Sequence, residues 1–230
     1  GHCRPQAVNA FYIEGGRLSP EDSRHAAIVL RLRPGDEIVA LDGVGGRFLA
    51  RLGEEGAVEI LEALPANEPR VRLTVYQGVP KADKLEHVIQ KATELGAYEI
   101  VAFPSARCVS RPDEKSLKKK LERWQKIAAS AAEQSGRGRI PQVLVLDSFH
   151  AALSRASEAD KALMFYENEQ AVTLKMALSG EYRTVSLLTG PEGGLEEKEV
   201  RQARETGLQV CTLGKRILRC ETAPLCALSA

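Results

Sequence analysis

The first third of the chain shows short apolar runs separated by glycine- and proline-containing turns. The runs at residues 10–13, 37–41 and 47–52 are interrupted by Gly-Gly, Pro-Gly and Asp-Gly pairs. Apolar runs between such pairs are typical of β-hairpins, and a small β-barrel is the natural closure of strands of this kind. The pattern therefore predicts a small β-barrel domain, which ends at a proline-containing linker over residues 65–69.

Beyond the linker, the pattern changes to apolar strands that alternate with helices. Strands are expected at residues 71–76, 99–103, 143–146, 162–166, 185–189 and 208–213. Strands that alternate with helices form a mainly parallel sheet with helices packed on it. We therefore predict an α/β fold with two domains, at residues 1–69 and 70–230.

Two of the helices have clear apolar faces. After Asp83, apolar residues recur at helical spacing, and Gly96 supplies a left-handed stop. A longer helix is predicted after residues 112–113 and ends near Gly136. Because Trp124 falls on the apolar face of this second helix, we expect it to pack in the core rather than to stack on a base.

Composition narrows the class of protein. A chain of 230 residues with 43% apolar and 27% charged residues can bury a substantial core. No segment approaches the roughly 20 apolar residues of a membrane helix, and the start of the chain lacks the apolar region of a signal peptide. The five cysteines are odd in number and lack C-x-x-C spacing, which argues against a metal site or a disulfide framework. We expect a cytoplasmic protein with reduced thiols, no metal and no membrane contact.

The charge is unevenly distributed along the chain. Residues 1–69 hold seven basic and eleven acidic residues, whereas residues 107–139 hold ten basic and four acidic ones. A basic run is often only a solvated helix face, but basic side chains that neutralise phosphates also supply affinity for RNA. We favour RNA contact for the basic residues of this segment, and the candidates are Arg107, Arg111, Lys115, Lys118, Lys119, Lys120, Arg123, Arg137 and Arg139.

Two glycine-containing segments near the C-terminus are candidates for a ligand site. The segments LLTGPEGGL at residues 187–195 and LGKRILRCETAP at residues 213–224 each follow an apolar strand. Open α/β sheets bind ligands at such strand ends. Neither segment has P-loop or dinucleotide-binding spacing, and Glu196 and Glu197 at the next helix start disfavour a phosphate. A cationic cofactor such as the sulfonium of S-adenosylmethionine (SAM) tolerates these carboxylates.

These two segments together resemble the cofactor loops of the bacterial 16S rRNA uridine-N3 methyltransferases, members of the SPOUT class of α/β-knot methyltransferases. Further matches lie at residues 25–36, 84–96, 123–127, 133–137 and 140–141, in the same order. The resemblance implies a six-stranded parallel sheet with a deep trefoil knot, preceded by a PUA-like barrel that assists RNA binding. It also implies a homodimer, in which the helix beginning near Thr222 is a plausible contact.

The resemblance further implies that three loops hold SAM, chiefly through backbone groups. Apolar side chains in these loops would flank the adenine. The residues that match are Phe165, Tyr166, Glu167, Leu188, Thr189, Gly190, Pro191, Glu192, Gly193, Gly194, Leu213, Gly214, Ile217 and Leu218.

Methylation at uridine N3 requires the N3 proton to leave, so the protein must position the two reactants and assist removal of this proton. The uridine must be unpaired, since N3 lies on its Watson–Crick edge. Arg219 is the candidate to hold O2 or O4 of the base, and Glu221 is the candidate proton acceptor. Glu192 and Glu94 are alternatives for the base, and a structural ion pair between Arg219 and Glu221 is the alternative to catalysis.

The implied partner is 16S rRNA, within the decoding region of the small ribosomal subunit. Two other functions stay open from the sequence. A ribose methyltransferase of the same knot class, acting on tRNA or rRNA, would share the cofactor loops but not the motifs at residues 84–96 and 133–137. A non-catalytic RNA-binding protein would keep the barrel and the basic helix without binding SAM.

Overall fold

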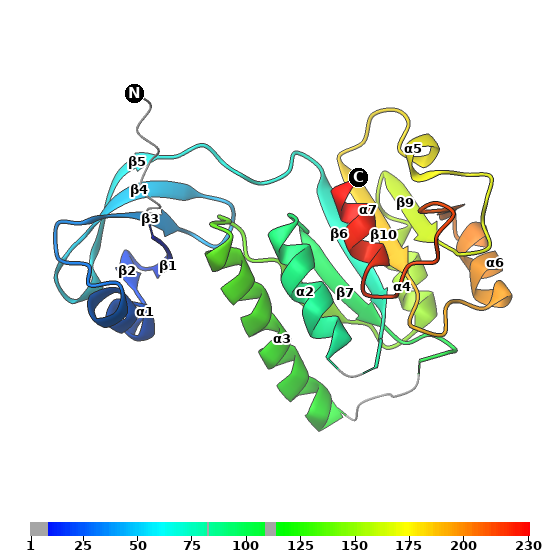
Figure 1. The fold of residues 1–230 in the computed structure, drawn as a ribbon, viewed down its shortest axis with the longest axis horizontal. Helices are drawn as coiled ribbons and strands as arrows, with labels where there is room; N and C mark the ends of the chain where they lie inside the picture. Colours follow the sequence, from blue (N-terminus) through cyan, green and yellow to red (C-terminus); the bar gives the residue numbers. More distant parts are fainter. Residues whose placement is uncertain (1–8, 82, 109–113) are drawn as a thin grey trace. The chain divides into compact units, whose positions relative to one another are not determined.

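The computed structural model describes residues 9–81, 83–108 and 114–230, with side chains from Ser116 onward in the last range. The chain divides into two compact units (Figure 1). The first unit contains the residues up to Glu68 together with Ala132–Ile140, and the second contains Pro69–Ala131 and Pro141–Ala230. The first division thus falls inside the predicted linker. Residues 132–140, which the sequence placed in the second domain, pack with the first unit.

A curled five-stranded sheet forms the first unit. Its strands are β1 (Ala10–Glu14), β2 (Arg17–Leu18), β3 (Glu37–Leu41), β4 (Arg47–Leu52) and β5 (Val58–Ala63), in the order β2-β1-β3-β4-β5. The two edges meet, because Arg17 forms an isolated bridge with Ala57 and the backbone N–H of Val58 donates to Gly16 O at 2.9 Å. This contact closes the sheet toward the predicted barrel around Phe11 and Ile38, which are both buried.

The hairpin pattern missed the helical segment between β2 and β3. This segment contains α1 (Pro20–Arg24) and the π-helical η1 (His25–Val29), and a short 3-10 helix, η2 (Glu54–Gly56), follows β4. The Ser19 hydroxyl accepts from the N–H of Asp22 at 3.0 Å, and Pro20 occupies the first turn. A serine followed by proline and two acidic residues is a helix-start signal, so this element was detectable from the sequence.

The second unit is built on a six-stranded sheet in the order β11-β9-β10-β6-β7-β8. Its strands are β6 (Arg72–Gly78), β7 (Glu99–Phe103), β8 (Gln142–Val145), β9 (Lys161–Phe165), β10 (Thr184–Thr189) and β11 (Gln209–Cys211). Every neighbouring pair is parallel. The predicted fold, a parallel six-stranded α/β sheet preceded by a small β-domain, is confirmed.

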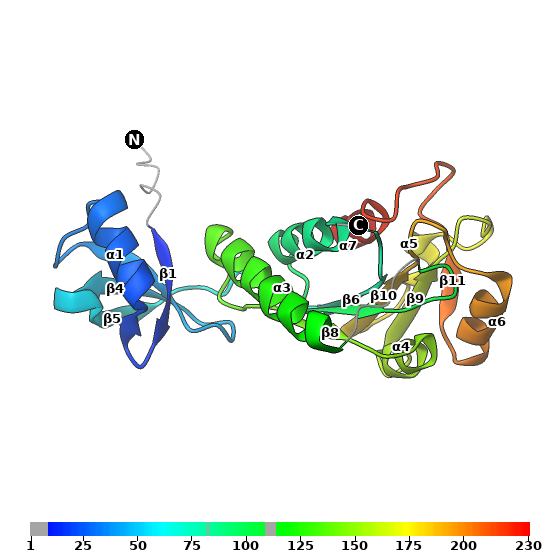
Figure 2. The same cartoon turned by 90° about the horizontal axis from the view of Figure 1, so that it is seen from below.

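Helices cover both faces of this sheet (Figure 2). One face packs against α2 (Lys84–Glu94), α3 (Glu114–Gln134), α5 (Leu174–Ala177) and α7 (Ala223–Ser229), and the other against α4 (Phe149–Ala156) and α6 (Glu197–Glu205). Successive strand residues alternate between the two cores, as the pleat requires: Leu163 belongs to the first core and Met164 to the second. Trp124 is buried in the first core, so its predicted packing role is confirmed.

Two further features belong to the described part of the chain. None of the described helices is both long and apolar enough to cross a membrane. Cys108, Cys211, Cys220 and Cys226 are all free thiols.

Candidate functional site

A cavity of about 440 Å³ lies in the second unit, where β9, β10 and β11 end. Its walls come from three loops that follow these strands, at residues 165–167, 189–195 and 212–220, together with Lys84 from α2 and Ala223 from α7. The carboxyl ends of parallel strands are where an open α/β sheet binds ligands. The two glycine-containing segments that the sequence singled out therefore meet in one site.

All the predicted cofactor residues except Leu188 line this cavity. Leu188 is fully buried in the core on the other face of the sheet, so its side chain is unavailable to a ligand, and the prediction that it flanks the adenine is wrong. Arg219 also lines the cavity, whereas Glu221 does not but contacts two residues that do, Lys84 and Cys220. The lining residues that sequence reasoning missed are Lys84, Leu195, Thr212, Lys215, Arg216, Cys220 and Ala223.

The glycines of the 189–195 loop are required by packing within the protein. A Cβ on Gly190 would lie 2.9 Å from Leu195 Cγ and 3.2 Å from the Gly194 carbonyl carbon. A Cβ on Gly78, at the end of β6, would lie 2.7 Å from Pro191 Cδ. Only glycine permits such close approach of backbone, and the loop therefore folds tightly on itself and on β6.

A buried glutamine holds the loop at residues 189–195 in place through hydrogen bonds. Gln77 is fully buried, and its Nε2 donates to Gly190 O at 2.9 Å and to Gly78 O at 3.0 Å. Its Oε1 accepts from the Thr189 hydroxyl at 2.9 Å. A buried amide whose donors and acceptor are all used holds its partners in place. Gln77 thus sets the position of the loop without lining the cavity, which sequence periodicity could not show.

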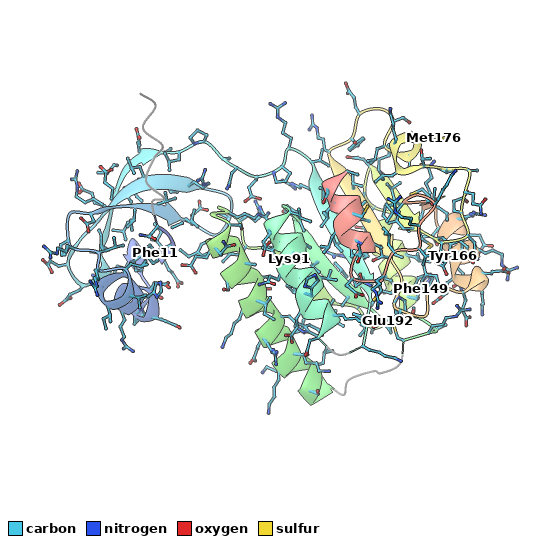
Figure 3. All side chains as sticks on the ribbon, in the orientation of Figure 1. Phe11, Lys91, Phe149, Tyr166, Met176 and Glu192 are labelled. Atoms are coloured by element: carbon cyan, nitrogen blue, oxygen red, sulfur yellow. The ribbon has the colours of Figure 1, made fainter. Side chains whose placement is uncertain are left out.

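Two carboxylates at the cavity share one lysine. Lys84 Nζ lies 3.2 Å from Glu192 Oε1 and 3.5 Å from Glu221 Oε2. The Lys81 N–H also donates to Glu192 Oε1 at 2.9 Å, and the Cys220 thiol donates to Glu221 Oε2 at 3.1 Å. Glu192 is labelled beside the loops of this site in Figure 3.

These contacts shift the acid–base properties of the site. Burial raises the pKa of Glu192, but hydrogen bonds from its own N–H and that of Lys81, with the Lys84 ammonium, outweigh burial and lower its pKa. The pKa of Glu221 is lowered, first by a hydrogen bond from its own N–H and then by the Cys220 thiol and Lys84. Burial and the contact with Glu221 raise the pKa of Cys220 to about 12. Both carboxylates are therefore ionised at neutral pH, beside a protonated thiol.

Arg219 is not the partner of Glu221. Within the ranges that the structure describes, the exposed Arg219 guanidinium has no ion pair or hydrogen bond, and the ion pair of Glu221 goes to Lys84. The Arg219–Glu221 ion pair, which the sequence left open as the alternative to catalysis, is therefore not formed. Glu94, an alternative base, pairs with Lys91 at 2.8 Å at the other end of α2 and does not line the cavity.

The predicted RNA-contacting residues fall into different environments. Lys118, Lys119 and Lys120 are exposed on α3. Arg123 is exposed but lies 2.8 Å from Glu86, and Arg107 donates to Gly193 O at 2.7 Å. Arg111 and the side chain of Lys115 lie outside the described residues.

Arg137 is buried, which corrects its assignment to RNA contact. Its side chain is 4% exposed and forms a two-point contact with Glu68, at 2.5 Å from Nη2 and 3.3 Å from Nε. The Arg139 N–H also donates to Glu68 Oε1 at 3.1 Å, and its side-chain Nη2 donates to Val44 O at 2.7 Å. A Cβ on Gly138 would lie 2.6 Å from Gly45 carbonyl atoms. The contacts of residues 137–139 thus attach the segment Ala132–Ile140 to the rest of the first unit.

Comparisons with known proteins define first the class of the chain. The family model described as "RNA methyltransferase domain" matches residues 67–230, and the model described as "RNA methyltransferase PUA domain" matches residues 18–61. The chain is therefore an RNA methyltransferase with a PUA domain.

The particular family follows from full-length relatives. The "Ribosomal RNA small subunit methyltransferase E" of Bacillus subtilis is 40% identical over 93% of this chain and 88% of its own length, and that of Mycobacterium tuberculosis is 34% identical over 91% and 83%. The solved structure of the Neisseria gonorrhoeae enzyme of this name, bound to SAM, is 36% identical, with a TM-score of 0.85 and coverage of 96% and 95%. The chain belongs to the ribosomal RNA small subunit methyltransferase E family, which confirms the resemblance and the SPOUT fold class predicted from its sequence.

The cavity fits SAM, the cofactor of this family. Its volume lies in the range of about 300–1,000 Å³ that small-molecule sites occupy. The aliphatic side chains of Leu213, Ile217 and Leu218 offer an apolar wall, and the wall also holds the carboxylates of Glu167 and of Glu192, the second of which is paired with Lys84. A putative methyltransferase of Legionella pneumophila, 28% identical with a TM-score of 0.83 and coverage of 97% and 96%, is also solved in complex with SAM.

Proposed function

We propose that this protein transfers a methyl group from SAM to N3 of a uridine in the 16S rRNA of the small ribosomal subunit. The observation that carries the proposal is the cavity at the ends of β9, β10 and β11, in a chain that belongs to a small-subunit rRNA methyltransferase family. The residues proposed to hold SAM are those of the three loops that line the cavity. Among them, Glu167 and Glu192 are proposed to face the positive charge of SAM.

The reaction forms one bond and breaks another. Bound SAM supplies an electrophilic methyl group on its sulfonium and departs as S-adenosylhomocysteine. Uridine N3 forms the new N–CH₃ bond and loses its proton. The protein must therefore hold an unpaired base against the cavity and stabilise the negative charge that develops on O2 and O4.

Arg219 and Glu221 are proposed for these two tasks. The guanidinium of Arg219, which has no partner among the described residues, lies at the wall of the cavity, where it can donate to a base oxygen. Glu221 is ionised and one contact away through Lys84. Its lowered pKa keeps the carboxylate ionised at neutral pH, and only the ionised form can accept the N3 proton, so we assign it proton acceptance directly or through a water molecule.

The remaining parts of the chain are proposed to serve the substrate. The PUA-like domain, assigned from the sequence to residues 1–69, assists RNA binding. The second domain, assigned to residues 70–230, carries catalysis. Two copies associate through α7, where Leu225 is half-buried and Cys226 exposed. The substrate is the rRNA of the small subunit, and the activity is placed in the cytoplasm.

Mass-spectrometric mapping of methylated nucleosides in 16S rRNA tests this proposal. We expect one N3-methyluridine to be absent from cells that lack this protein and to return with the wild-type gene. A missing ribose methylation would assign the chain to the ribose-modifying members of the knot class. An unchanged modification map, together with no SAM binding in calorimetry, would favour a non-catalytic RNA-binding protein.

The lysine run of α3 provides a separate test of RNA contact. Replacing Lys118, Lys119 and Lys120 by alanine should weaken RNA binding and flatten the slope of log affinity against log salt by up to about 2 to 3 units, because each phosphate contact releases counterions. The matched control replaces Lys175, Lys198 and Arg201, three exposed basic residues of α5 and α6. An equal change in both triple variants would show that overall charge, rather than local contact, is responsible.

A further inference from the structure

Lys84 is the only residue outside the three loops and α7 that lines the cavity among the described residues. It is the first residue of α2 and begins the motif at residues 84–96, to which sequence reasoning assigned no role in the site. Its ammonium lies between Glu192, from the loop after β10, and Glu221, from the loop after β11. One side chain therefore touches both segments that form the cofactor cavity.

We propose that Lys84 is a positioning residue that ties the two cofactor loops together through Glu192 and Glu221 and so sets the shape of the SAM site. The inference rests on the proposed function, because it takes the cavity to be the SAM site. The new element is the role of Lys84 as a structural partner that Glu192 and Glu221 share.

The geometry supports a bridge rather than two separate surface contacts. The Glu192 and Glu221 side chains are 26% and 21% exposed, and Lys84 is 33% exposed. Glu192 is held from a second side by the Lys81 N–H, and Glu221 by the Cys220 thiol. Both carboxylates are thus pre-oriented toward the ammonium. Partly exposed ion pairs are individually weak, so the bridge should tune SAM affinity rather than decide whether the protein folds.

The chain offers a matched control on the same helix. Lys91 has similar exposure, 39%, and also forms an ion pair, with Glu94, but neither residue lines the cavity. Lys91 is labelled on α2 in Figure 3, away from Glu192. Lys84→Met and Lys91→Met therefore both remove one positive charge and its ion pairing from α2. Only Lys84→Met breaks the link between the two cofactor loops.

We expect Lys84→Met to weaken SAM binding about five- to tenfold in titration calorimetry with the full chain, without a large change in melting temperature. Lys84→Arg should restore most of the affinity, and Lys91→Met should stay within about twofold of wild type. Glu192→Gln and Glu221→Gln should each weaken SAM binding, but by less when Lys84 is already Met, because coupled residues are not additive.

The pH dependence of SAM affinity adds a readout that a loss of packing would not move. The groups facing Lys84 are Glu192, Glu221 and the Cys220 thiol. Both carboxyls have lowered pKa values in the folded protein. They are therefore fully ionised above the ordinary pKa of a glutamate, and they lose their charge only as the pH falls through the lowered pKa of the folded protein. Removing the ammonium raises both pKa values. The acid loss of SAM affinity should therefore begin at higher pH in Lys84→Met than in wild type or Lys91→Met.

The outcomes separate this inference from the proposed function. Wild-type protein that binds no SAM would overturn both. SAM binding by Lys84→Met that matches Lys91→Met, or full-sized effects of Glu192→Gln and Glu221→Gln in the Lys84→Met background, would overturn the bridge alone. Failure of Lys84→Arg to restore affinity while melting stays unchanged would also count against it.

Discussion

Replacing Arg219 by alanine should lower the rate of methyl transfer by about 10²-fold or more while changing SAM affinity little. The guanidinium lines the cavity, is exposed and has no partner among the described residues, so no protein contact is lost with it. An interaction made mainly in the transition state reduces turnover without reducing ground-state binding. Glu221→Gln should also lower the rate, but its loss breaks the contact with Lys84, so its SAM affinity should fall as well.

The deciding measurement is single-turnover methylation of saturating small subunits, run beside SAM titration and thermal melts for each variant. Arg219→Lys is the informative companion of Arg219→Ala, because it keeps the charge but not the planar donor fork that pairs with base oxygens. A near wild-type rate for Arg219→Ala would remove this residue from the catalytic assignment. A parallel loss of SAM affinity and rate would make it a cofactor ligand instead.

The sequence predicted the site best where function depends on local backbone. The strand ends and glycine turns at residues 187–195 and 213–224 were recognisable as a pair, and the structure brings them to one cavity. Strand and helix periodicity also predicted every strand of the parallel sheet to within a few residues. These features are encoded by short stretches of chain, in which neighbours in sequence are neighbours in space.

What could not be predicted depends on partners far apart in the chain. Gln77 acts on Gly190, and Lys84 acts on Glu192 and Glu221. Each looks unremarkable in its own segment: one is a polar residue at a strand end and the other is a lysine at a helix start. A knot is likewise a property of how the whole chain threads, so its prediction here came from resemblance to a family and not from periodicity.

Arg137 shows the opposite error, in which a local pattern was over-interpreted. It stands in a basic stretch and follows a basic helix, so charge alone placed it with the RNA-contacting residues. The structure surrounds it with fixed partners in the first unit. Glu68 binds the guanidinium, and the Tyr12 hydroxyl donates to its carbonyl oxygen at 2.7 Å. A buried arginine in such contacts stabilises a fold rather than a complex.

We therefore expect Arg137→Met to lower the free energy of unfolding of the first unit by about 3–5 kcal/mol, the usual effect of removing one member of a buried ion pair. The cost arises because the Glu68 carboxylate, only 16% exposed, keeps its charge without its main partner. Arg51→Met is the matched control in the same unit, since the Arg51 and Glu59 side chains are 48% and 68% exposed. An exposed pair of this kind contributes about 0–1 kcal/mol.

Calorimetric melting of the full chain, followed by RNA binding at several salt concentrations, separates the two roles of Arg137. A structural role predicts a lower first transition for Arg137→Met, an almost unchanged one for Arg51→Met, and, below that transition, the same salt dependence of RNA affinity as wild type. A role in phosphate contact predicts the reverse, with unchanged melting and a salt slope that falls by about one unit. Because the guanidinium is enclosed by the protein and its charge is met by Glu68, the first result is expected.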